Sequence, residues 1–269
     1  MYLQIDGIDY YAYTAAHVIN PTFETIVFVH GTSMDHSVWA LQSRYFAYHD
    51  YNILAIDLPG HGHSGGDALN RVEDYAAWLV EMMQQADGQC FHLVGHSMGA
   101  LICLEAAAQY GQSAPTLCSL SLVGFSYPMT VTPVLLDAAR DNPTEAYSMM
   151  TQWSHTSAIG GEPNPGFWSA GSQMSMMENS RPGTVFTDLT ACNNYQGGPE
   201  AIEKTSCPML FISGVQDKMA PAKLARKEAD NNSNAEIVML PRCGHSIMSE
   251  NPDGVRDSLR HFITKSKND

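Results

Sequence analysis

The chain has 269 residues, 44% of them hydrophobic, and its 28 acidic residues outnumber its 14 Lys and Arg to give a net charge of −14. This length suffices for one large α/β domain, or for one domain with a modest insertion. Because a strongly acidic surface repels phosphate backbones and anionic membranes, the charge argues against nucleic-acid binding and against a membrane partner.

The sequence indicates neither a membrane-spanning segment nor an N-terminal secretory signal. No run of about 18 apolar residues is present, and residues 1–17 lack a basic stretch followed by an apolar one. The cysteines show no Cys-x-x-Cys spacing, which favours free thiols in a reducing compartment. They are Cys90, Cys103, Cys118, Cys192, Cys207 and Cys243. These features predict a cytoplasmic protein without a transmembrane helix.

In chain order, residues 3–13 alternate apolar and polar positions around Asp6-Gly7, which predicts a hairpin at a sheet edge. Short apolar runs and segments of helical period then follow one another with short loops between them. The expected strands are 26–29, 53–56, 91–94, 117–123, 209–212 and 236–240. The expected helices are 36–48, 72–85, 100–110 and about 253–264. This alternation predicts a mostly parallel, doubly wound α/β sheet covered on both faces.

The alternation is interrupted once, between residues 126 and 205, where no strand is expected. Residues 160–166, GGEPNPG, indicate a loop, and residues 133–139 and 144–153 indicate short helices. We therefore predict a core domain of residues 1–125 and 206–269. A mainly helical cap or lid, residues 126–205, is expected to lie over the carboxyl ends of the strands, where open α/β sheets keep their sites.

Residues 91–110 read FHLVGHSMGALICLEAAAQY, which is a strand-like apolar run, a Gly-x-Ser-x-Gly turn and a helix without internal breakers. A strand-to-helix turn of this kind is a nucleophile elbow, which holds the serine in a strained conformation with its hydroxyl exposed. Gly95 and Gly99 leave room where a Cβ would collide with neighbouring backbone. Ser97 is therefore the candidate nucleophile.

A serine hydroxyl needs a base within hydrogen-bond reach. His245 directly follows the last expected strand and is the candidate base, and Asp217 follows the preceding strand and is the candidate acid. Both should lie at the same sheet edge as Ser97, because the carboxyl ends of parallel strands meet there. Asp188, within the insertion, is a weaker candidate for the acid.

Acyl transfer also requires donors for the developing oxyanion. The residue after the nucleophile supplies one through its backbone, here the N–H of Met98. The second should come from the loop after strand 26–29, with the N–H of Thr32 preferred and that of Ser33 next. His30, in the same loop, is expected to hold the loop rather than to act in catalysis.

Five motifs together resemble those of the α/β-hydrolase fold family, and they span nearly the whole chain outside the insertion. They are His30-Gly31, Asp57-x-x-Gly60-x-Gly62-x-Ser64, Gly95-His96-Ser97-Met98-Gly99, Gly214-x-x-Asp217 and Gly244-His245. The resemblance implies a triad of Ser97, Asp217 and His245 in the family's chain order, a structural loop at 57–64, and a cap formed by the insertion. Haloalkane dehalogenases and epoxide hydrolases carry aspartate as the nucleophile, so serine at position 97 argues against those activities.

The insertion is rich in methionine and aromatic residues, which suit an adaptable apolar pocket, although each could equally pack the insertion onto the sheet. We expect Trp153, Trp168 and Met177 to line the substrate pocket together with Ser33. Within the insertion, Arg181 is the one basic residue that we consider as a partner for an anionic substrate.

Two histidine pairs raise the possibility of a metal site. His61 and His63 are two residues apart, and His92 and His96 are four apart, but no third ligand follows at a familiar spacing. No dinucleotide-binding or Walker-type glycine pattern is present either. We therefore expect neither a metal nor a cofactor.

These observations predict a serine hydrolase, most simply a carboxylesterase acting on small-molecule esters of short to medium acyl chains. The same machinery serves other reactions on this fold, because the fold does not specify the substrate. The alternatives are hydrolysis of a carbon–carbon bond in a vinylogous diketone, thioester hydrolysis, lactone hydrolysis and perhydrolysis. A ligand receptor that keeps the triad without turnover is a further alternative, and the oligomeric state is left open.

Overall fold

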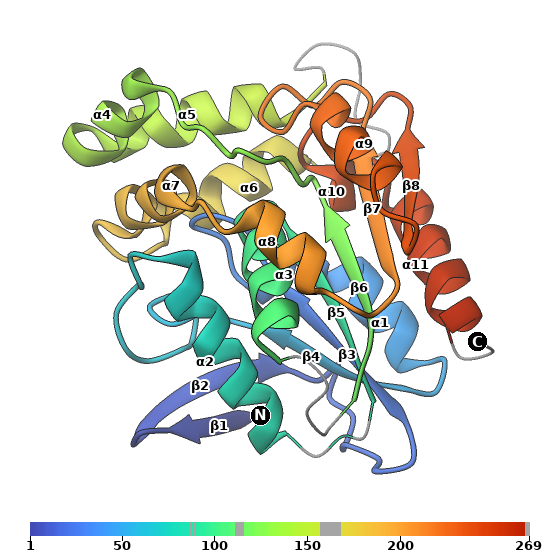
Figure 1. Ribbon diagram of the computed structural model, residues 1–269. Coiled ribbons are helices and arrows are strands. Elements are labelled where there is room, and N and C mark those ends of the chain that lie inside the picture. Colours follow the sequence, from blue (N-terminus) through green and yellow to red (C-terminus); the bar gives the residue numbers. More distant parts are fainter. Residues whose placement is uncertain (87, 89, 111–115, 157–167, 267–269) are drawn as a thin grey trace.

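The computed structural model describes residues 1–86, 88, 90–110, 116–156 and 168–266, and its centre is one sheet of eight strands (Figure 1). The strand order is β1-β2-β4-β3-β5-β6-β7-β8. The strands are β1 (Tyr2–Ile5), β2 (Ile8–Tyr13), β3 (Glu24–Val29), β4 (Tyr51–Ile56), β5 (Cys90–His96), β6 (Thr116–Val123), β7 (Met209–Gly214) and β8 (Ala235–Leu240). Strands β3 to β8 pair in parallel, which confirms the predicted sheet.

The predicted hairpin forms the antiparallel edge of this sheet. Ile5 of β1 pairs with Ile8 of β2, and β2 pairs antiparallel with β4. Asp6 and Gly7 connect the two strands with φ angles of 49° and 78°. Positive φ at both central residues gives the backbone twist that a two-residue hairpin turn needs.

Helices cover both faces of the sheet. They are η1 (His36–Trp39), α1 (Ala40–Ala47), α2 (Val72–Gln85), α3 (Met98–Tyr110), α4 (Pro133–Asp141), α5 (Pro143–Ser154), α6 (Ser169–Glu178), α7 (Thr184–Asn194), α8 (Gly198–Lys204), α9 (Ala222–Asp230), α10 (Ile247–Glu250) and α11 (Pro252–Ser266). Along β3, Val27 and Val29 join the apolar cluster that contains α2 and α3, whereas Ile26 and Phe28 join the cluster that contains α1 and α11. The strand is thus buried on both faces, as a doubly wound sheet requires.

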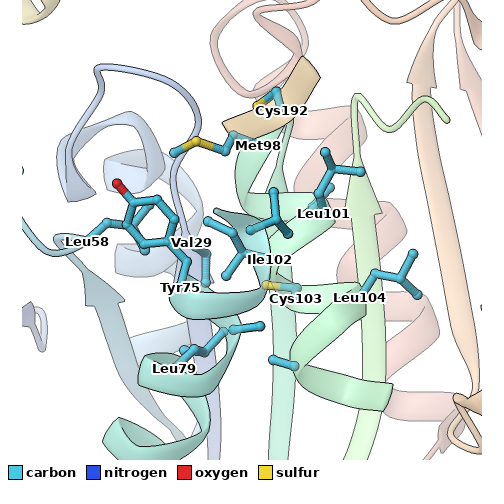
Figure 2. Close-up of a cluster of buried hydrophobic side chains, with 14 of the residues drawn as sticks. Val29, Leu58, Tyr75, Leu79, Met98, Leu101, Ile102, Cys103, Leu104 and Cys192 are labelled. Atoms are coloured by element: carbon cyan, nitrogen blue, oxygen red, sulfur yellow. The ribbon is translucent and has the colours of Figure 1, made fainter. Parts of the chain in front are cut away.

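Helix α3 is held by apolar contacts along most of its length. Leu101, Ile102 and Leu104 are fully buried, and Ile102 lies on the side of α3 toward Tyr75 and Leu79 of α2 (Figure 2). Burying one such side chain contributes about 1.5–3 kcal/mol. The packing therefore fixes the helix, and with it the turn that precedes it, on the sheet.

Five helices and no strand occur in the described part of the chain between β6 and β7. Figure 1 shows α4, α5, α6 and α7 across the end of the sheet toward which the arrows of β6 and β8 point, while α8 packs against α3. Helices α4 and α5 match the two that the sequence predicts, and α6, α7 and α8 were not expected. The expected loop at 160–166 lies outside the described residues.

The cysteines differ from the sequence-based expectation. Cys90 and Cys118 form a disulfide bond, with their Cα atoms 5.7 Å apart. Their strands β5 and β6 are neighbours whose register shifts between Phe91 and His92, and this shift leaves Cys118 as an additional residue beside Cys90. Motif spacing cannot reveal a pair that only strand pairing brings together. Free thiols were therefore the wrong expectation for these two residues, and the cysteines no longer support a reducing compartment.

The remaining cysteines, Cys103, Cys192, Cys207 and Cys243, are free and buried. None of the helices in the described residues has the length and apolar character needed to cross a membrane.

Candidate active site

The turn between β5 and α3 has the strained geometry that its sequence predicts. Ser97 has a φ of 55°, and its amide donates to the carbonyl of Val123 across 2.9 Å. A Cβ at position 95 would lie 2.2 Å from the carbonyl oxygen of Gly99, and one at position 99 would lie 2.5 Å from that of Val29. Glycine is thus required on both sides of Ser97, because backbone atoms cannot move aside.

His245 and Asp217 form a buried hydrogen-bonded pair at the same edge of the sheet. The Nδ1 atom of His245 lies 2.7 Å from Oδ2 of Asp217. The other oxygen of Asp217 accepts from the amides of Met219 and Ala220 across 2.9 and 2.7 Å. These amide donors stabilise the ionised carboxylate, which in turn orients the imidazole with Nδ1 protonated.

The backbone amide and the backbone carbonyl of His245 both make hydrogen bonds, which hold its loop in place. The His245 amide donates to the carbonyl of Ser154 across 2.7 Å, and the His245 carbonyl accepts from Nε2 of His96 across 2.9 Å. Burial and the nearby His245 imidazole lower the pKa of His96 to about 3. His96, one of the residues considered for a metal, is therefore a neutral donor that connects the Ser97 turn to the His245 loop.

The loop after β3 places Thr32 and Ser33 beside this turn. The Ser33 amide donates to Asp188 Oδ2 across 2.8 Å, whereas no hydrogen bond among the described residues uses the Thr32 amide. Met98 is the first residue of α3, where amides have no acceptor within the helix. The Thr32 and Met98 amides are thus available to a ligand, and the Ser33 amide is occupied.

His30 holds the Thr32 loop, as the sequence suggests. Its Nδ1 donates to the carbonyl of Gly31 across 2.8 Å, and its Nε2 accepts from the amide of Leu58 across 3.1 Å. Burial, together with the neighbouring His61, lowers its pKa to about 4. A neutral imidazole with one donor and one acceptor nitrogen satisfies both contacts.

A pocket of about 110 Å³ lies over Ser97, and the described residues that line it include both core and insertion residues. From the core come Thr32, Ser97, Lys218, Met219, Ala220 and His245. From the insertion come Met129, Thr130, Val131, Thr132, Leu135, Trp153, Leu189 and Cys192. Ser97 and His245 therefore face a common space, which the insertion covers.

Of the four residues predicted for the pocket, only Trp153 lines it. Ser33 is buried with its amide turned to Asp188, and Met177 is fully buried in the core. Trp168 lies at the start of α6 and is 73% exposed. Methionine and aromatic content could not separate lining residues from packing residues, because both environments are apolar.

Two charged residues of the insertion also have roles other than those considered. Asp188 does not contact His245, and its carboxylate instead contacts Ser33, His61 and Tyr75. Arg181 donates to the backbone carbonyls of Ser64 and Gly66, so it fastens the insertion to the core and is not a pocket cation. Lys218, which sequence reasoning passed over although it follows Asp217, is exposed and is among the residues that line the pocket.

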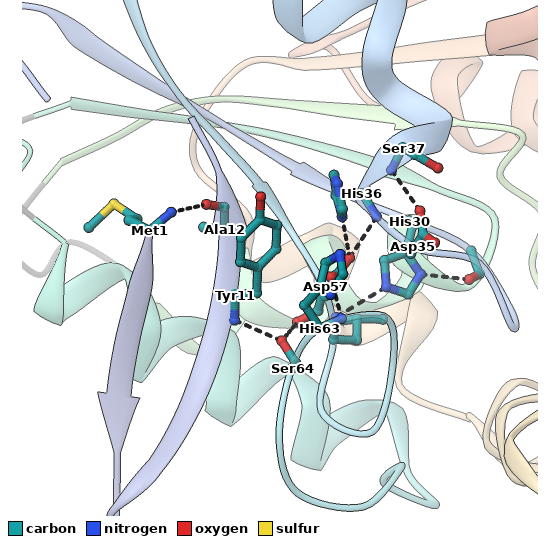
Figure 3. A network of polar contacts seen from close by, with 12 residues as sticks. Met1, Tyr11, Ala12, His30, Asp35, His36, Ser37, Asp57, His63 and Ser64 are labelled. Atoms are coloured by element: carbon teal, nitrogen blue, oxygen red, sulfur yellow. Dashed lines mark hydrogen bonds and ion pairs between the residues drawn. The ribbon is translucent and has the colours of Figure 1, made fainter. Parts of the chain in front are cut away.

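Two other histidines considered for a metal have protein partners. His61 contacts Pro59 and Asp188, and His92 contacts Ser119 and Glu24. The Asp57 loop is structural, as expected: Asp57 accepts from the amide and Nδ1 of His36 and from the amide of His63 (Figure 3).

Known proteins similar to this chain identify its family. A sequence profile described as the alpha/beta hydrolase family matches residues 26–258. The chain belongs to the alpha/beta hydrolase family. It is 23% identical over 246 residues to the (E)-2-((N-methylformamido)methylene)succinate hydrolase of Acinetobacter baylyi, an alignment that covers 89% of this chain and 90% of that one.

Solved structures of the same fold include two enzymes of nearly equal length. An esterase from Exiguobacterium antarcticum superposes with a TM-score of 0.85 at 17% identity, covering 98% of both chains. The enol-lactonase from Burkholderia xenovorans has a TM-score of 0.85 at 19% identity, covering 98% of this chain and all of that one (100%). These alpha/beta hydrolases act on different substrates, so the comparisons establish a hydrolase fold and leave the substrate to the site.

Proposed function

We propose that this alpha/beta hydrolase is a serine carboxylesterase that hydrolyses short- to medium-chain carboxylic esters through an acyl-enzyme. The observation that carries the proposal is the 2.7 Å contact between His245 Nδ1 and Asp217, on the pocket that Ser97 also lines. An oriented imidazole and a serine hydroxyl on one pocket are the groups that nucleophilic serine catalysis requires.

In this proposal Ser97 Oγ attacks the ester carbonyl while His245 Nε2 takes the hydroxyl proton. The amides of Thr32 and Met98 hold the resulting oxyanion. Collapse of the tetrahedral intermediate breaks the bond to the alcohol, which leaves with the proton from His245. Water then attacks the acyl-enzyme, again with His245 as the base, and releases the acid and Ser97.

The size of the pocket supports the short end of the acyl range. An apolar cavity of about 150 Å³ admits benzene, and the pocket over Ser97 measures about 110 Å³. Its apolar side chains, among them Val131, Leu135 and Leu189, suit an alkyl chain.

The test is hydrolysis of a p-nitrophenyl ester series from acetate to long acyl chains by the wild type and Ser97→Ala. From the comparison of cavity volumes, we expect the highest kcat/KM for acyl chains of about two to four carbons. The variant should show no measurable turnover. Absence of turnover on every ester, with Ser97 still labelled by an organophosphonate, would contradict the esterase and favour a carbon–carbon, thioester or perhydrolase activity. Absence of labelling would favour a receptor.

Lys218 favours a second candidate function, namely hydrolysis of a substrate that carries a carboxylate, such as an acidic ester, an enol-lactone or a vinylogous diketone. Lys218 lines the pocket, and the ion pairs found among the described residues do not include it. The Acinetobacter baylyi relative is named for a succinate derivative, which is a dicarboxylate. A lysine at the pocket can pair with such a group.

This second candidate is tested with p-nitrophenyl hemisuccinate and the neutral pentanoate of similar length. Because an exposed ion pair contributes about 0.2–1 kcal/mol, Lys218→Met should lower the kcat/KM ratio of the acidic to the neutral ester by about 1.4- to fivefold, less at high salt. Lys223→Met, on exposed α9, makes the same change in net charge away from the pocket and should leave the ratio unchanged. Equal ratios in all three proteins would exclude a role for Lys218 in charge recognition.

A further inference from the structure

A second carboxylate is buried within reach of the pocket, and the triad does not use it. Asp188 of α7 is completely buried, and three donors from separate parts of the core surround its carboxylate. The Ser33 amide lies 2.8 Å from Oδ2, His61 Nε2 lies 2.9 Å from the same oxygen, and the Tyr75 hydroxyl lies 3.2 Å from Oδ1. Three donors stabilise the ionised form of a carboxylate.

The geometry around His61 requires it to be positively charged. Nδ1 lies 2.9 Å from the carbonyl oxygen of Pro59, and Nε2 faces the Asp188 carboxylate. Both neighbours are acceptors, so both ring nitrogens must carry a proton. Burial opposes this charge, but Asp188 outweighs burial and raises the pKa of His61. Asp188 and His61 thus form an ion pair with no exposed side-chain surface.

This ion pair contacts the loop after β3 at Ser33, the residue that follows the Thr32 oxyanion donor. Ser33 has a φ of 53°, in the left-handed region, which costs about 1–3 kcal/mol for a non-glycine residue and persists only where the surroundings enforce it. Asp188 holds the amide of Ser33, and Cys192, one turn further along α7, lines the pocket together with Thr32. One helix of the insertion therefore holds the backbone at Ser33 and covers the pocket beside Thr32.

We propose that Asp188 is a positioning residue for the oxyanion hole, an inference that rests on the proposed esterase function. By binding the Ser33 amide, Asp188 keeps that donor out of the pocket and orients the preceding amide, that of Thr32, toward the substrate oxygen. An unpaired carboxylate this close would repel a developing oxyanion. His61 removes that repulsion, because its positive charge neutralises Asp188 without occupying the Ser33 amide.

The test compares Asp188→Ala and Asp188→Asn on a p-nitrophenyl ester and on its thionoester, in which sulfur replaces the carbonyl oxygen. Sulfur accepts hydrogen bonds weakly, so a displaced oxyanion donor slows the ester more than the thionoester. Because loss of one oxyanion donor typically costs about 10²–10³ in kcat, we expect Asp188→Ala to lower kcat for the ester by about 10²-fold, with KM changed less than about threefold. The ester-to-thionoester rate ratio should fall by about tenfold.

Asp188→Asn is the conservative variant, because its remaining oxygen can still accept from Ser33, and it should restore most of the ratio. Asp57→Ala is the matched control. Asp57 is likewise a fully buried carboxylate that accepts two amides and an imidazole, but it does not contact residues 32 and 33. We expect Asp57→Ala to lower the thermal midpoint and to leave the rate ratio at the wild-type value.

If Asp188→Ala does not fold, His61→Gln gives an independent measurement. It leaves the Asp188 carboxylate without its counter-charge and should lower the same ratio. A wild-type ratio in Asp188→Ala, or in His61→Gln where Asp188→Ala does not fold, would overturn the positioning role and leave the esterase proposal intact. Absence of any Ser97-dependent turnover in the wild type would instead overturn both.

Discussion

Two histidine–carboxylate pairs are buried beside the pocket, and they differ in what contacts the second ring nitrogen. In the His245–Asp217 pair, 2.7 Å long, one imidazole nitrogen faces the carboxylate, and the residue lines the pocket. In the His61–Asp188 pair, 2.9 Å long, the other nitrogen is taken by the carbonyl of Pro59. A histidine can exchange a proton with substrate only through a free nitrogen. The first pair is therefore suited to proton transfer and the second to holding a fixed charge.

The two carboxylates also differ in how they are built into the chain. Asp217 takes its amide donors from residues two and three positions further along, within one turn. Asp188 takes donors from segments 113 to 155 residues away. The Asp217 carboxylate is held within the loop after β7, whereas Asp188 cross-links the insertion to three parts of the core. In the proposed mechanism the same two residue types thus serve chemistry in one place and geometry in the other.

The largest expected difference between the pairs appears when the acid of each pair is replaced by its amide. Asp217→Asn keeps the shape of the site but favours the wrong imidazole tautomer, a change that costs about 10⁴-fold in kcat in serine proteases. We expect a loss of about 10³–10⁴-fold here, with little change in KM, measured by steady-state kinetics on the preferred ester. Asp188→Asn, by contrast, should lose little. Equal losses in the two variants would contradict the assignment of separate roles.

The fold and the proximity of His245 to Asp217 were predictable because their signals are local. Gly-x-Ser-x-Gly after an apolar run predicts the strained turn at Ser97, and Asp217 and His245 each follow a strand whose carboxyl end must lie at the same edge. The Asp188–His61 pair had no such signal. Asp188 lies in a segment without strand order, and His61 was noted only as half of a His-x-His pattern. Contacts that join distant segments depend on how the insertion packs, which one sequence does not encode in its spacing.

The helices that were not expected differ in how visible they are in the sequence. Helix α6, SAGSQMSMME, contains glycine and serines, and helix α7, TVFTDLTACNN, is rich in β-branched residues; these residues have weak helix preference, so packing against the core offsets local propensity. Helix α9 was not expected either, although its buried residues Ala222, Ala225 and Ala229 recur at helical spacing. The sequence therefore held a missed signal for α9 and a weak one for α6 and α7.

An effect of intermediate size concerns the pH dependence of stability. His61 has a raised pKa in the folded protein, while in the unfolded chain the imidazole has its ordinary pKa of about 6.5. The pair therefore contributes its full stability below about pH 6.5 and loses it as the pH rises through the folded pKa. We expect the difference in free energy of unfolding between wild type and His61→Gln to be largest near pH 6 and to shrink at alkaline pH.

Urea denaturation over a pH series measures this difference directly. A difference that grows with pH would mean that His61 is neutral in the folded protein, and it would remove the counter-charge that the role of Asp188 requires. Measurement of the ester-to-thionoester ratio over the same pH range provides a link to function. That ratio should decline in the wild type as His61 loses its proton and should stay level in His61→Gln.

The smallest effect is expected for a third pair, His36 and Asp57, which is a histidine–carboxylate contact outside the pocket lining. The pair is drawn in Figure 3, where Asp57 is completely buried and the His36 side chain is 17% exposed. His36 is not among the described residues that line the pocket. Burial disfavours its charge, yet the hydrogen bond that Nδ1 donates to Asp57 raises the pKa of His36 overall. Two backbone amides also donate to Asp57, so the carboxylate keeps partners when the imidazole is removed.

His36→Asn retains a neutral donor near the position of Nδ1 and removes only the charge. Because solvent screens a partly exposed pair, we expect a loss of less than about 1 kcal/mol at pH 6, which vanishes as the pH rises through the raised pKa. The kcat and the ester-to-thionoester ratio should equal those of the wild type. All three pairs join a histidine to a buried carboxylate, but only two of them touch the reacting region. A kinetic effect of His36→Asn would therefore show that charge influences the oxyanion without any contact to residues 32 and 33. That result would contradict the proposal that Asp188 acts through its contact with Ser33.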